Sequence, residues 1–407
     1  MNIWKISIQN IKSKPLYTFL SIFVLTISIA LLLGIKQLKN AFKNQIDHNL
    51  GKIDVVIGAK GSPLQLVLAS VLHLDNPTGN ISYSKAKKIA KNPMVKMAVP
   101  ISYGDNYKGY RIVGTTHNFI SLYKAELATG RYVKKSMEVV LGYTAAQQLQ
   151  LYLGDTFLST HGLVENSVEE HEDEFTVVGV LKPTQKVIDR LIITNLESIW
   201  DAHNGDEIHD EHEEHDHYNV HHDNEDKEIT SLLINFKTPR ALFTFPRRIN
   251  KSTNMQAVLP KYQLEKLYEY TSIGFKTMSW IAYLILLMSC FIIFISLYKM
   301  VKERAFYLAI LRTYGASNFQ LIKMVMYETL SIAFSSFVLG LLLTKIGLPH
   351  MLYFMQPIYK QSLLIGLPVL EILQIALLIF ATVILSVLLA IRPIITMNIS
   401  TILSHEK

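Results

Sequence analysis

The chain has 407 residues, half of them hydrophobic, and a formal net charge of +7. The apolar residues are gathered into long uncharged stretches, which indicates membrane spans rather than a wholly soluble protein. A single cysteine excludes an internal disulfide, and basic residues near the predicted membrane ends favour contact with anionic lipid over binding of nucleic acid.

Residues 1–36 predict an interfacial helix followed by a first membrane span. The stretch "KISIQNIKSK" alternates apolar and basic side chains, as an amphipathic helix at a membrane surface does. Between Lys14 and Lys36 stand 21 uncharged residues, and a helix needs about 20 to cross the hydrocarbon core. Because no small-residue cleavage site follows, we interpret this span as an uncleaved anchor rather than a signal peptide.

Residues 37–272 predict a large extracytoplasmic α+β domain on a helical stalk. The stalk helices are "KQLKNAFKNQIDHNL" after the first span and "PKYQLEKLYEYTSIGFKTM" before the second. Between them, short runs rich in valine and isoleucine end at Gly, Asn or Asp, which is typical of strands. Strands are predicted within 52–60, 108–116, 137–143, 174–182, 190–196 and 229–237, and short helices within 84–92 and 145–154.

Residues 62–80, "SPLQLVLASVLHLDNPTGN", predict an amphipathic helix followed by a turn. The apolar face is broad, which supports the hypothesis that this segment lies at the membrane surface or lines an entrance between two subunits. His73 lies on the same face. We interpret it as a structural residue, because a lone histidine on an apolar face is more often packed than bound to a metal.

Residues 203–228 form a tract of alternating histidine and carboxylate. Seven of the fourteen histidines fall between His203 and His222, and eleven acidic residues and one lysine fall between 206 and 228. Neutral imidazoles suit zinc, copper and nickel, and neighbouring carboxylates can complete the ligand shell. The candidate metal ligands are His209, His212, His215, His217, His221 and His222.

The chemistry of this tract has two interpretations. Neither C-x-x-C nor H-E-x-x-H is present in the chain, so the sequence indicates neither a closed structural zinc site nor a metalloprotease. One interpretation is weak, adaptable contact with Zn²⁺ or another divalent ion. The other is a solvated acidic loop whose histidines are incidental.

Three further spans are predicted at 273–299, 321–347 and 369–392. The loop 300–320 and the short segment 348–368 separate them, and a tail covers 393–407. Basic residues gather before the first span, within the 300–320 loop and after the fourth span. The positive-inside rule therefore places both termini and that loop in the cytoplasm, and the segments 37–272 and 348–368 outside.

The loop between the second and third spans contains "KERAFYLAILRTYGAS". A charged pair, Glu303 and Arg304, precedes a short helix, a turn follows at Gly315, and Ser317 is placed to cap the next helix. Such a rigid, positively charged element is suited to fit a groove on a cytoplasmic partner and to pass on its movement.

This loop resembles the coupling element of permeases in the MacB/FtsX/LolC superfamily of ABC transporters, where an E-R…ILR-x-x-GAS pattern precedes the third span. "IVGTT", "LATGRYV", "EVVLGYTAAQQLQLYLGDTF" and "FTVVGVLK" are similar to patterns of the family's outer domain. The resemblance covers nearly the whole chain. It implies four spans, with the large domain between the first and second. The residues that match the coupling motif are Glu303, Arg304, Arg312, Gly315, Ala316 and Ser317.

The resemblance also implies partners. Two copies of the permease, or two related permeases, pair with two copies of an ATP-binding subunit in the bacterial inner membrane, and the permease itself is not an enzyme. The chain lacks G-x-x-x-x-G-K-[ST], so we expect ATP hydrolysis in a separate polypeptide, as in the FtsX and LolC types. Cys290 falls inside the second span and is interpreted as a packing residue.

The cargo stays open among three alternatives. "GAKGSPLQLVLASVLHLDNPTGNI" is similar to a subgroup associated with zinc-responsive gene clusters that contain histidine-rich periplasmic proteins, which implies zinc uptake or handling with a periplasmic metal-binding partner. The second alternative is extraction or efflux of a lipoprotein, lipid, peptide or drug. The third is FtsX-like signalling to a periplasmic partner, in which a histidine tract has no obvious use.

Overall fold

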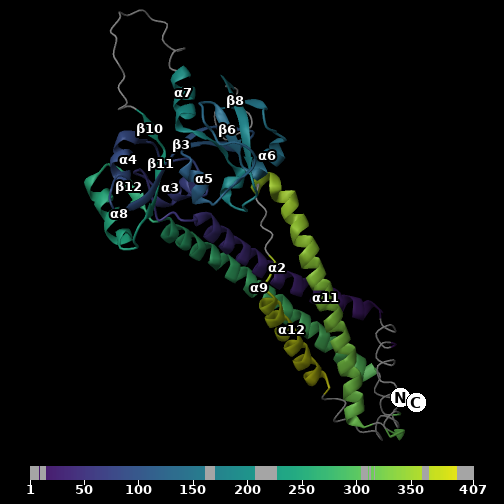
Figure 1. Cartoon of the computed structure of the whole chain (residues 1–407). Coiled ribbons are helices and arrows are strands. Elements are labelled where there is room, and N and C mark those ends of the chain that lie inside the picture. The colour runs from purple at the N-terminus through teal and green to yellow at the C-terminus, as the bar shows by residue number, and fades with distance from the viewer. Residues whose placement is uncertain are drawn as a thin grey trace, which may run out of the picture. The chain divides into compact units, whose positions relative to one another are not determined.

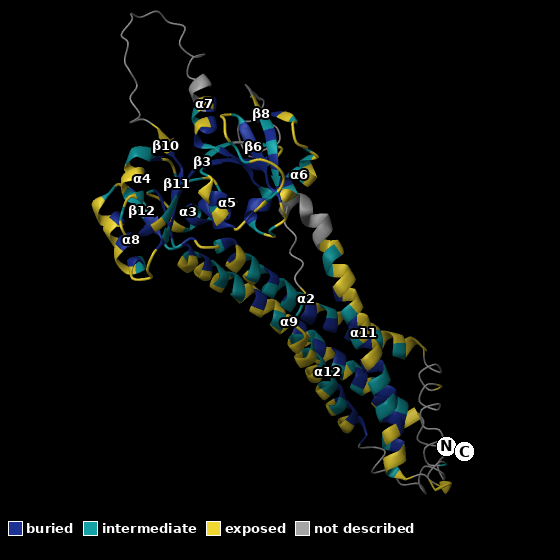
Figure 2. Cartoon of the chain, in the orientation of Figure 1, coloured by how far each residue is buried: buried dark blue, intermediate teal, exposed yellow. Residues whose placement is uncertain are grey.

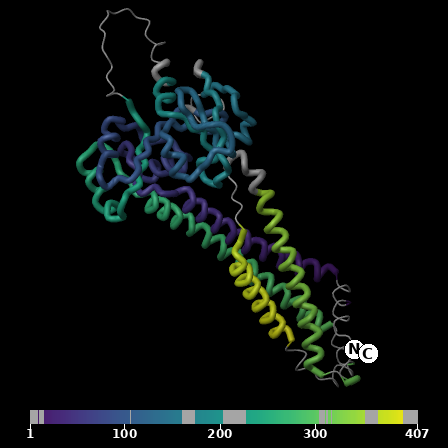
Figure 3. The backbone as a smooth tube through the Cα atoms, in the orientation of Figure 1, coloured from purple at the N-terminus to yellow at the C-terminus, as the bar shows by residue number. Residues whose placement is uncertain are grey.

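The computed structural model describes residues 9, 15–160, 170–206, 227–303, 310, 313–315, 317–359 and 366–391. The chain divides into a helical unit and an outer unit, and its course can be followed in Figures 1 and 3. The helical unit contains residues 1–42, 271–357 and 363–407, and the outer unit contains residues 43–270 with 358–362.

Four helices in the described part of the chain are long and apolar enough to cross a membrane. They confirm the predicted class of fold, a four-span membrane protein with an α+β domain between the first and second spans. Helix α11 continues beyond residue 347, where we expected the third span to end. The helices are α2 (Pro15–Leu50), α9 (Pro260–Glu303), α11 (Asn318–Tyr359) and α12 (Val369–Ala390).

Helices α2 and α11 approach each other closely along a seam of small residues. A side chain added at Gly340 would meet Ile29 Cγ2 at 2.6 Å, so only glycine fits this helix crossing. Close to it, the Thr344 hydroxyl lies 3.4 Å from the carbonyl oxygen of Ala30. Small residues let transmembrane helices pack backbone against backbone, which is how spans associate without a hydrophobic driving force between them.

Polar contacts join α2 to the other two spans. Ser28 on α2 and Ser289 on α9 share a buried hydrogen bond of 2.7 Å. Nearer the outer unit along α2, Asn40 donates a 2.8 Å hydrogen bond to Glu371, which lies in the first turn of α12. Helix α2 therefore contacts all three of its neighbours.

The predicted stalk is formed by continuations of α2 and α9. Phe42 and Phe275 contact each other through their rings in the helical unit, with centroids 6.2 Å apart. In the outer unit, Lys43 lies over the ring of Tyr268. The two helices thus run antiparallel as a pair beyond their most apolar stretch, as the sequence predicts.

The outer unit is built on a ten-stranded mixed sheet. The strand order is β12-β1-β11-β3-β4-β9-β6-β8-β5, with β7 pairing with β3 and β8. A two-stranded sheet, β10-β2, is separate. Pairs β4–β9 and β6–β8 are parallel and the others are antiparallel. The strands are β1 (Val55–Ala59), β2 (Ile81–Ser82), β3 (Val95–Tyr107), β4 (Tyr110–Thr115), β5 (Leu127–Gly130), β6 (Glu138–Leu141), β7 (Thr156–Thr160), β8 (Glu170–Leu181), β9 (Ile192–Asn195), β10 (Glu228–Ile229), β11 (Ser231–Phe236) and β12 (Met255–Val258).

Short helices cover this sheet, and the buried residues of the strands lie beneath them (Figure 2). Each of the six predicted strand segments contains a strand, and both predicted helices are present. Strands β2, β3, β5, β7 and β12 were not expected. The helices are α3 (Pro63–Ser70), α4 (Tyr83–Ala90), α5 (Asn118–Leu122), α6 (Tyr143–Leu149), α7 (Leu196–Asp206) and α8 (Ala241–Ser252), with a 3₁₀ turn η1 (Val187–Arg190).

The hypothesis that residues 62–80 lie at a membrane surface is wrong for the buried part of this segment. Helix α3 packs its apolar face onto the sheet, where Leu66 and Val67 are fully buried. A side chain added at Gly58 on β1 would meet the end of the Leu66 side chain, so the glycine lets α3 lie close against the strand. The amphipathic pattern therefore reflects a core helix of the outer unit.

Candidate functional site

The described part of the loop between α9 and α11 is a tight turn that starts α11. The backbone N–H of Tyr314 donates to the carbonyl of Ile310, which closes one helical turn. Gly315 follows with φ +93°, in the left-handed region where a side chain is strained. The turn therefore needs glycine at this position, as the sequence pattern predicts.

Ser317 caps α11 through a reciprocal pair of hydrogen bonds. The backbone N–H of Gln320 donates to the Ser317 hydroxyl at 3.3 Å, and the Ser317 N–H donates to Gln320 Oε1 at 3.1 Å. This is a capping box, which satisfies two backbone donors and fixes where the helix begins. The predicted role of Ser317 as a cap is confirmed.

Two aromatic side chains on this turn were missed by the sequence reasoning. Tyr314 is 87% exposed and Phe319 is 71% exposed, and they flank Gly315 and Ser317 in the chain. Large exposed aromatics beside a rigid turn are typical anchors of a protein interface. The signal in the sequence was an aromatic residue on each side of the Gly-Ala-Ser turn, in a loop expected to contact a partner.

The remaining coupling residues are only partly described. Glu303 is the last residue of α9, and its carboxylate lies 3.9 Å from the ammonium of Lys299 one turn earlier. Both side chains are about half exposed, so this ion pair contributes little to stability. Arg304, Arg312 and Ala316 lie outside the described residues. The structure thus brings Gly315 and Ser317 into one turn, and the coupling role of all six residues stays a prediction.

The two ends of the histidine tract lie in described elements of the outer unit. The tract starts within α7 and ends at β10, a strand of the separate two-stranded sheet, where Trp200 Nε1 donates a 2.8 Å hydrogen bond to the carbonyl of Glu228. Lys227 lies over the Trp200 ring at 4.7 Å, and Tyr83 contacts the same ring. All six candidate ligands lie outside the described residues. Within those that are described, no group of three or more His, Cys, Asp or Glu could hold a metal ion.

His73 is a buried residue of the outer unit. Tyr103 contacts its Nδ1 through a 2.7 Å hydrogen bond, and its ring packs edge-on against Phe119. Burial, together with the positive charges of Arg111 and Arg190, holds the pKa of His73 well below its usual value. The imidazole is therefore neutral, and its packing agrees with the structural interpretation.

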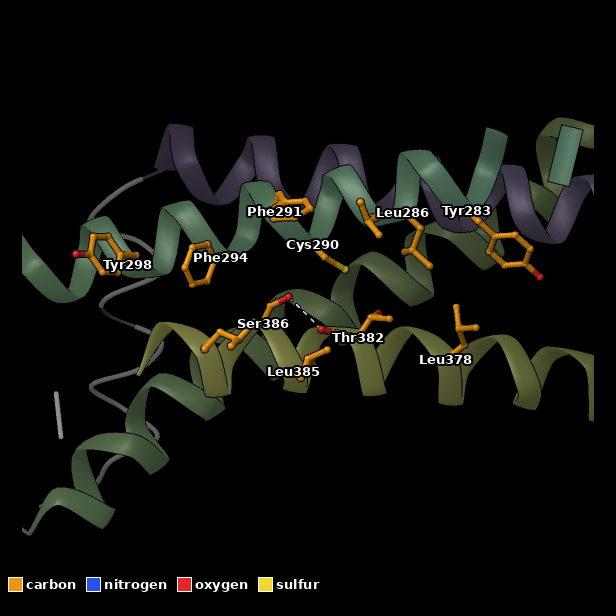
Figure 4. Close-up of a pocket in the computed structure, with 12 residues that line it drawn as sticks. Tyr283, Leu286, Cys290, Phe291, Phe294, Tyr298, Leu378, Thr382, Leu385 and Ser386 are labelled. Atoms are coloured by element: carbon orange, nitrogen blue, oxygen red, sulfur yellow. Dashed lines mark hydrogen bonds between the residues drawn. The ribbon is translucent and has the colours of Figure 1, made fainter. Parts of the chain in front are cut away.

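A groove of about 700 Å³ lies between α9 and α12 in the helical unit (Figure 4). Leu286, Cys290 and Phe291 line it from α9, and Thr382 and Ser386 are the polar residues on the α12 side. Both hydroxyls donate to carbonyls of their own helix, at 2.9 and 3.0 Å. The surface offered to an occupant is consequently apolar, and the half-buried Cys290 contributes to it.

Four apolar helices, a mixed-sheet domain between the first two and a capped turn before the third define a membrane protein with one large domain outside its spans. Two family models match the chain. The MacB-like periplasmic core domain covers residues 18–232, and the FtsX-like permease C-terminal domain covers residues 279–399. The chain therefore belongs to the MacB/FtsX-like family of ABC transporter permeases, as its sequence resemblance implied.

Two solved structures are similar to this chain. The periplasmic region of MacB from Actinobacillus actinomycetemcomitans is 11% identical, with a TM-score of 0.35 over 56% of this chain and 97% of that one. The extracellular domain of the noncanonic ABC-type transporter YknZ from Gram-positive bacteria is 12% identical, with a TM-score of 0.31 over 50% and 98%. The search of curated proteins found no match.

Membership of this family indicates the general role of the chain in a transporter. Permeases of the MacB/FtsX type work with ATP-binding subunits in ABC transporters and are not themselves the catalytic chains. The chain is thus the membrane-embedded component of such a system, with a periplasmic-type domain between its first two spans.

Proposed function

We propose that this chain is the permease subunit that couples ATP hydrolysis in a separate ATP-binding subunit to movement of its own outer domain. The observation that carries the proposal is the turn at Gly315 with its exposed aromatics Tyr314 and Phe319. The capping box at Ser317 fixes this turn rigidly to α11. A displacement of the turn is thereby passed to a helix of 42 residues.

The seams of the helical unit support transmission of that displacement. Helix α11 packs closely against α2 at Gly340 and Ile29, and such tight packing resists sliding of one helix along the other. Helix α2 is in turn bonded to α9 through Ser28 and Ser289. Because α2 and α9 are also the stalk helices, a change in their packing reaches the outer unit along two continuous helices. This is the mechanotransmission that the sequence resemblance implied.

The proposal includes an orientation. The loop 300–320 and both termini are cytoplasmic, the outer unit is periplasmic, and the chain resides in the bacterial inner membrane as a homodimer or as half of a pair of related permeases. The basic residues near the loop support this orientation by the positive-inside rule. They include Lys299, Lys302 and Lys323.

The docking role is tested with the double variant Tyr314→Ala/Phe319→Ala. We expect co-purification with the ATP-binding subunit, and the stimulation of its ATPase activity by the permease, to fall at least about tenfold, since buried aromatic anchors carry much of an interface's energy. Phe243→Ala is the matched control, because Phe243 is 77% exposed on the outer unit. Retained stimulation in the double variant would refute the docking role.

For the cargo, we propose zinc or another divalent ion, handled with a periplasmic metal-binding partner. This rests on the chemistry of the tract containing His209, His212, His215, His217, His221 and His222. The test removes residues 207–226, which keeps the bond between Trp200 and Glu228 at the base of the tract. We expect micromolar Zn²⁺ to change the ATPase rate of the wild-type complex and not of the deletion variant. An identical response in both would exclude the tract as a zinc sensor.

The groove between α9 and α12 favours a second candidate function, movement of a hydrophobic molecule. Its apolar lining and volume suit a lipid-like cargo or a hydrophobic drug. The substitution Cys290→Trp fills the groove from α9. A hydrophobic cargo predicts that this variant loses transport while the deletion of 207–226 is silent, whereas a zinc role predicts the reverse pattern.

A further inference from the structure

A cleft in the outer unit has no role in the function proposed above. It has a volume of about 540 Å³ and lies where α3, α8, β12 and the start of α9 meet. Figure 1 shows α3, α8 and β12 grouped at one end of the large sheet. The floor is apolar, formed by Met255, Ala257 and Val258, which are buried. A concave apolar floor of this size fits a ligand of several residues.

The rim of the cleft is positively charged. Lys60 reaches it from the end of β1, and Arg247 reaches it from α8. Both are exposed, and neither takes part in an ion pair among the described residues. The stretch from Arg240 to Leu264 contains five basic residues and no acidic residue. The positive electrostatic potential at the cleft therefore favours an anionic ligand.

Two further groups point to recognition of a peptide. Gln256 lines the cleft, and its Nε2 is buried without a hydrogen-bond partner, although its Oε1 accepts from the Gly61 N–H at 3.4 Å. A buried amide donor without a partner is costly unless a ligand supplies the acceptor. Tyr262, 60% exposed, stands on the rim with Pro63. Tyrosine and arginine are enriched where peptides and proteins bind.

The edge of the sheet decides the mode of recognition. Strand β12 is the last strand of the sheet, so its outer edge could in principle pair with an incoming strand. Asn250 occupies that edge, since its side chain accepts from the N–H of Ala257 and donates to its carbonyl. Thr253 accepts from the N–H of Met255 in the same way. Strand addition is blocked, and a ligand is recognised through its side chains.

We propose that this cleft docks an acidic, partly apolar peptide segment of a partner protein. A carboxylate of the segment lies between Lys60 and Arg247, and an apolar side chain of the segment rests on the floor formed by Met255 and Val258. The partner acts on the outer unit independently of the turn that carries the ATPase, so failure of one assignment leaves the other intact.

The test measures fluorescence anisotropy of a labelled peptide, acetyl-Leu-Asp-Leu-Asp-Leu, with the full chain in nanodiscs. The control peptide replaces each Asp by Asn. We expect the acidic peptide alone to bind, and Arg247→Met to weaken binding at least about tenfold. Arg248→Met is the matched control, because Arg248 is the exposed neighbour that does not line the cleft, and it changes binding less than about twofold.

Three outcomes would overturn the proposal. The first is equal binding of the Asp and Asn peptides, or equal effects of the two arginine substitutions. The second is full competition by inorganic phosphate or acetate at concentrations matching the peptide, which would assign the cleft to a small anion. The third is binding that appears only after residues 207–226 are removed, which would assign the cleft to the chain's own acidic tract.

Discussion

Glu138 is held by four donors, and its removal gives a sharp test of the outer unit's structure. Arg131 donates from Nη1 and Nη2 to the two carboxylate oxygens at 2.7 and 2.6 Å, and the N–H groups of Lys134 and Lys135 donate at 2.9 and 3.1 Å. Glu138 is 9% exposed. The bonds from Arg131 are the main cause that lowers the pKa of Glu138 from 4.5 to about 2.

The substitution Glu138→Gln keeps the shape and removes the charge. Glutamine has one acceptor oxygen for donors that used two, and its own amide N–H₂ faces other donors. Hydrogen bonds to a charged group contribute about 1.5–3 kcal/mol, and Arg131 is half exposed, so we expect a loss of about 2 kcal/mol. For a domain of this size, that lowers the unfolding midpoint by about 4–8 °C.

The loss depends on pH in a defined direction. The folded pKa of Glu138 lies below its unfolded value, so the carboxylate stabilises the fold fully above pH 4.5, and this contribution declines as the pH falls toward 2. Thermal unfolding of the full chain, followed by near-ultraviolet circular dichroism at pH 7 and pH 3, measures both effects. We expect the gap between wild type and variant to be wide at pH 7 and much narrower at pH 3.

Glu126→Gln is the matched control. Its carboxylate pairs with Lys182 at 2.8 Å, but the two side chains are 73% and 56% exposed. An exposed pair is screened by solvent and contributes little to stability, so the midpoint should move by only about a degree or two. If Glu138→Gln were no more destabilising than Glu126→Gln, or if its effect were unchanged at pH 3, the reasoning about this cluster would be refuted.

Two further predictions concern the helical unit. Gly340→Ala should destabilise the packing of α2 against α11 by about 1–3 kcal/mol, because the added Cβ meets Ile29. Gly274→Ala is the control and should be neutral or stabilising, because nothing lies within 4 Å of its added Cβ. Thermal unfolding in nanodiscs compares the two variants, and equal unfolding midpoints would contradict the close packing at Gly340. Ser317→Ala removes the hydroxyl that caps α11 and should destabilise the start of the helix by about 1 kcal/mol. We expect faster hydrogen exchange in the first turn of α11, and unchanged exchange would show that the cap is not needed.

The sequence predicted those parts of the structure that depend on local patterns. The four spans follow from long uncharged runs, which need no knowledge of tertiary contacts. The six predicted strands likewise have their valine and isoleucine residues next to one another in the chain. Strand β3 was missed because Pro100 and Gly104 interrupt its pattern, although both lie inside a strand of 13 residues. The order of strands was also out of reach, since the parallel pairing of β4 with β9 joins residues about 80 positions apart.

The candidate sites show the same division. Gly315 and Ser317 were predicted correctly because their roles, a left-handed turn and a helix cap, are local. The exposure of Tyr314 and Phe319 depends on what the rest of the helical unit leaves uncovered, so composition could not reveal it. The apolar face of residues 62–80 was expected at a membrane surface or an entrance between two subunits, because an amphipathic pattern does not say which apolar surface covers it.

The central claim is that the turn at Gly315 is the contact for the ATP-binding subunit. It is tested most directly by placing a photoreactive amino acid at position 314 of the full chain and irradiating living cells. We expect one crosslinked product, which contains the ATP-binding subunit, and none with that subunit when the same amino acid replaces Phe243. A crosslink to the ATP-binding subunit from position 243, or its absence from position 314, would contradict it.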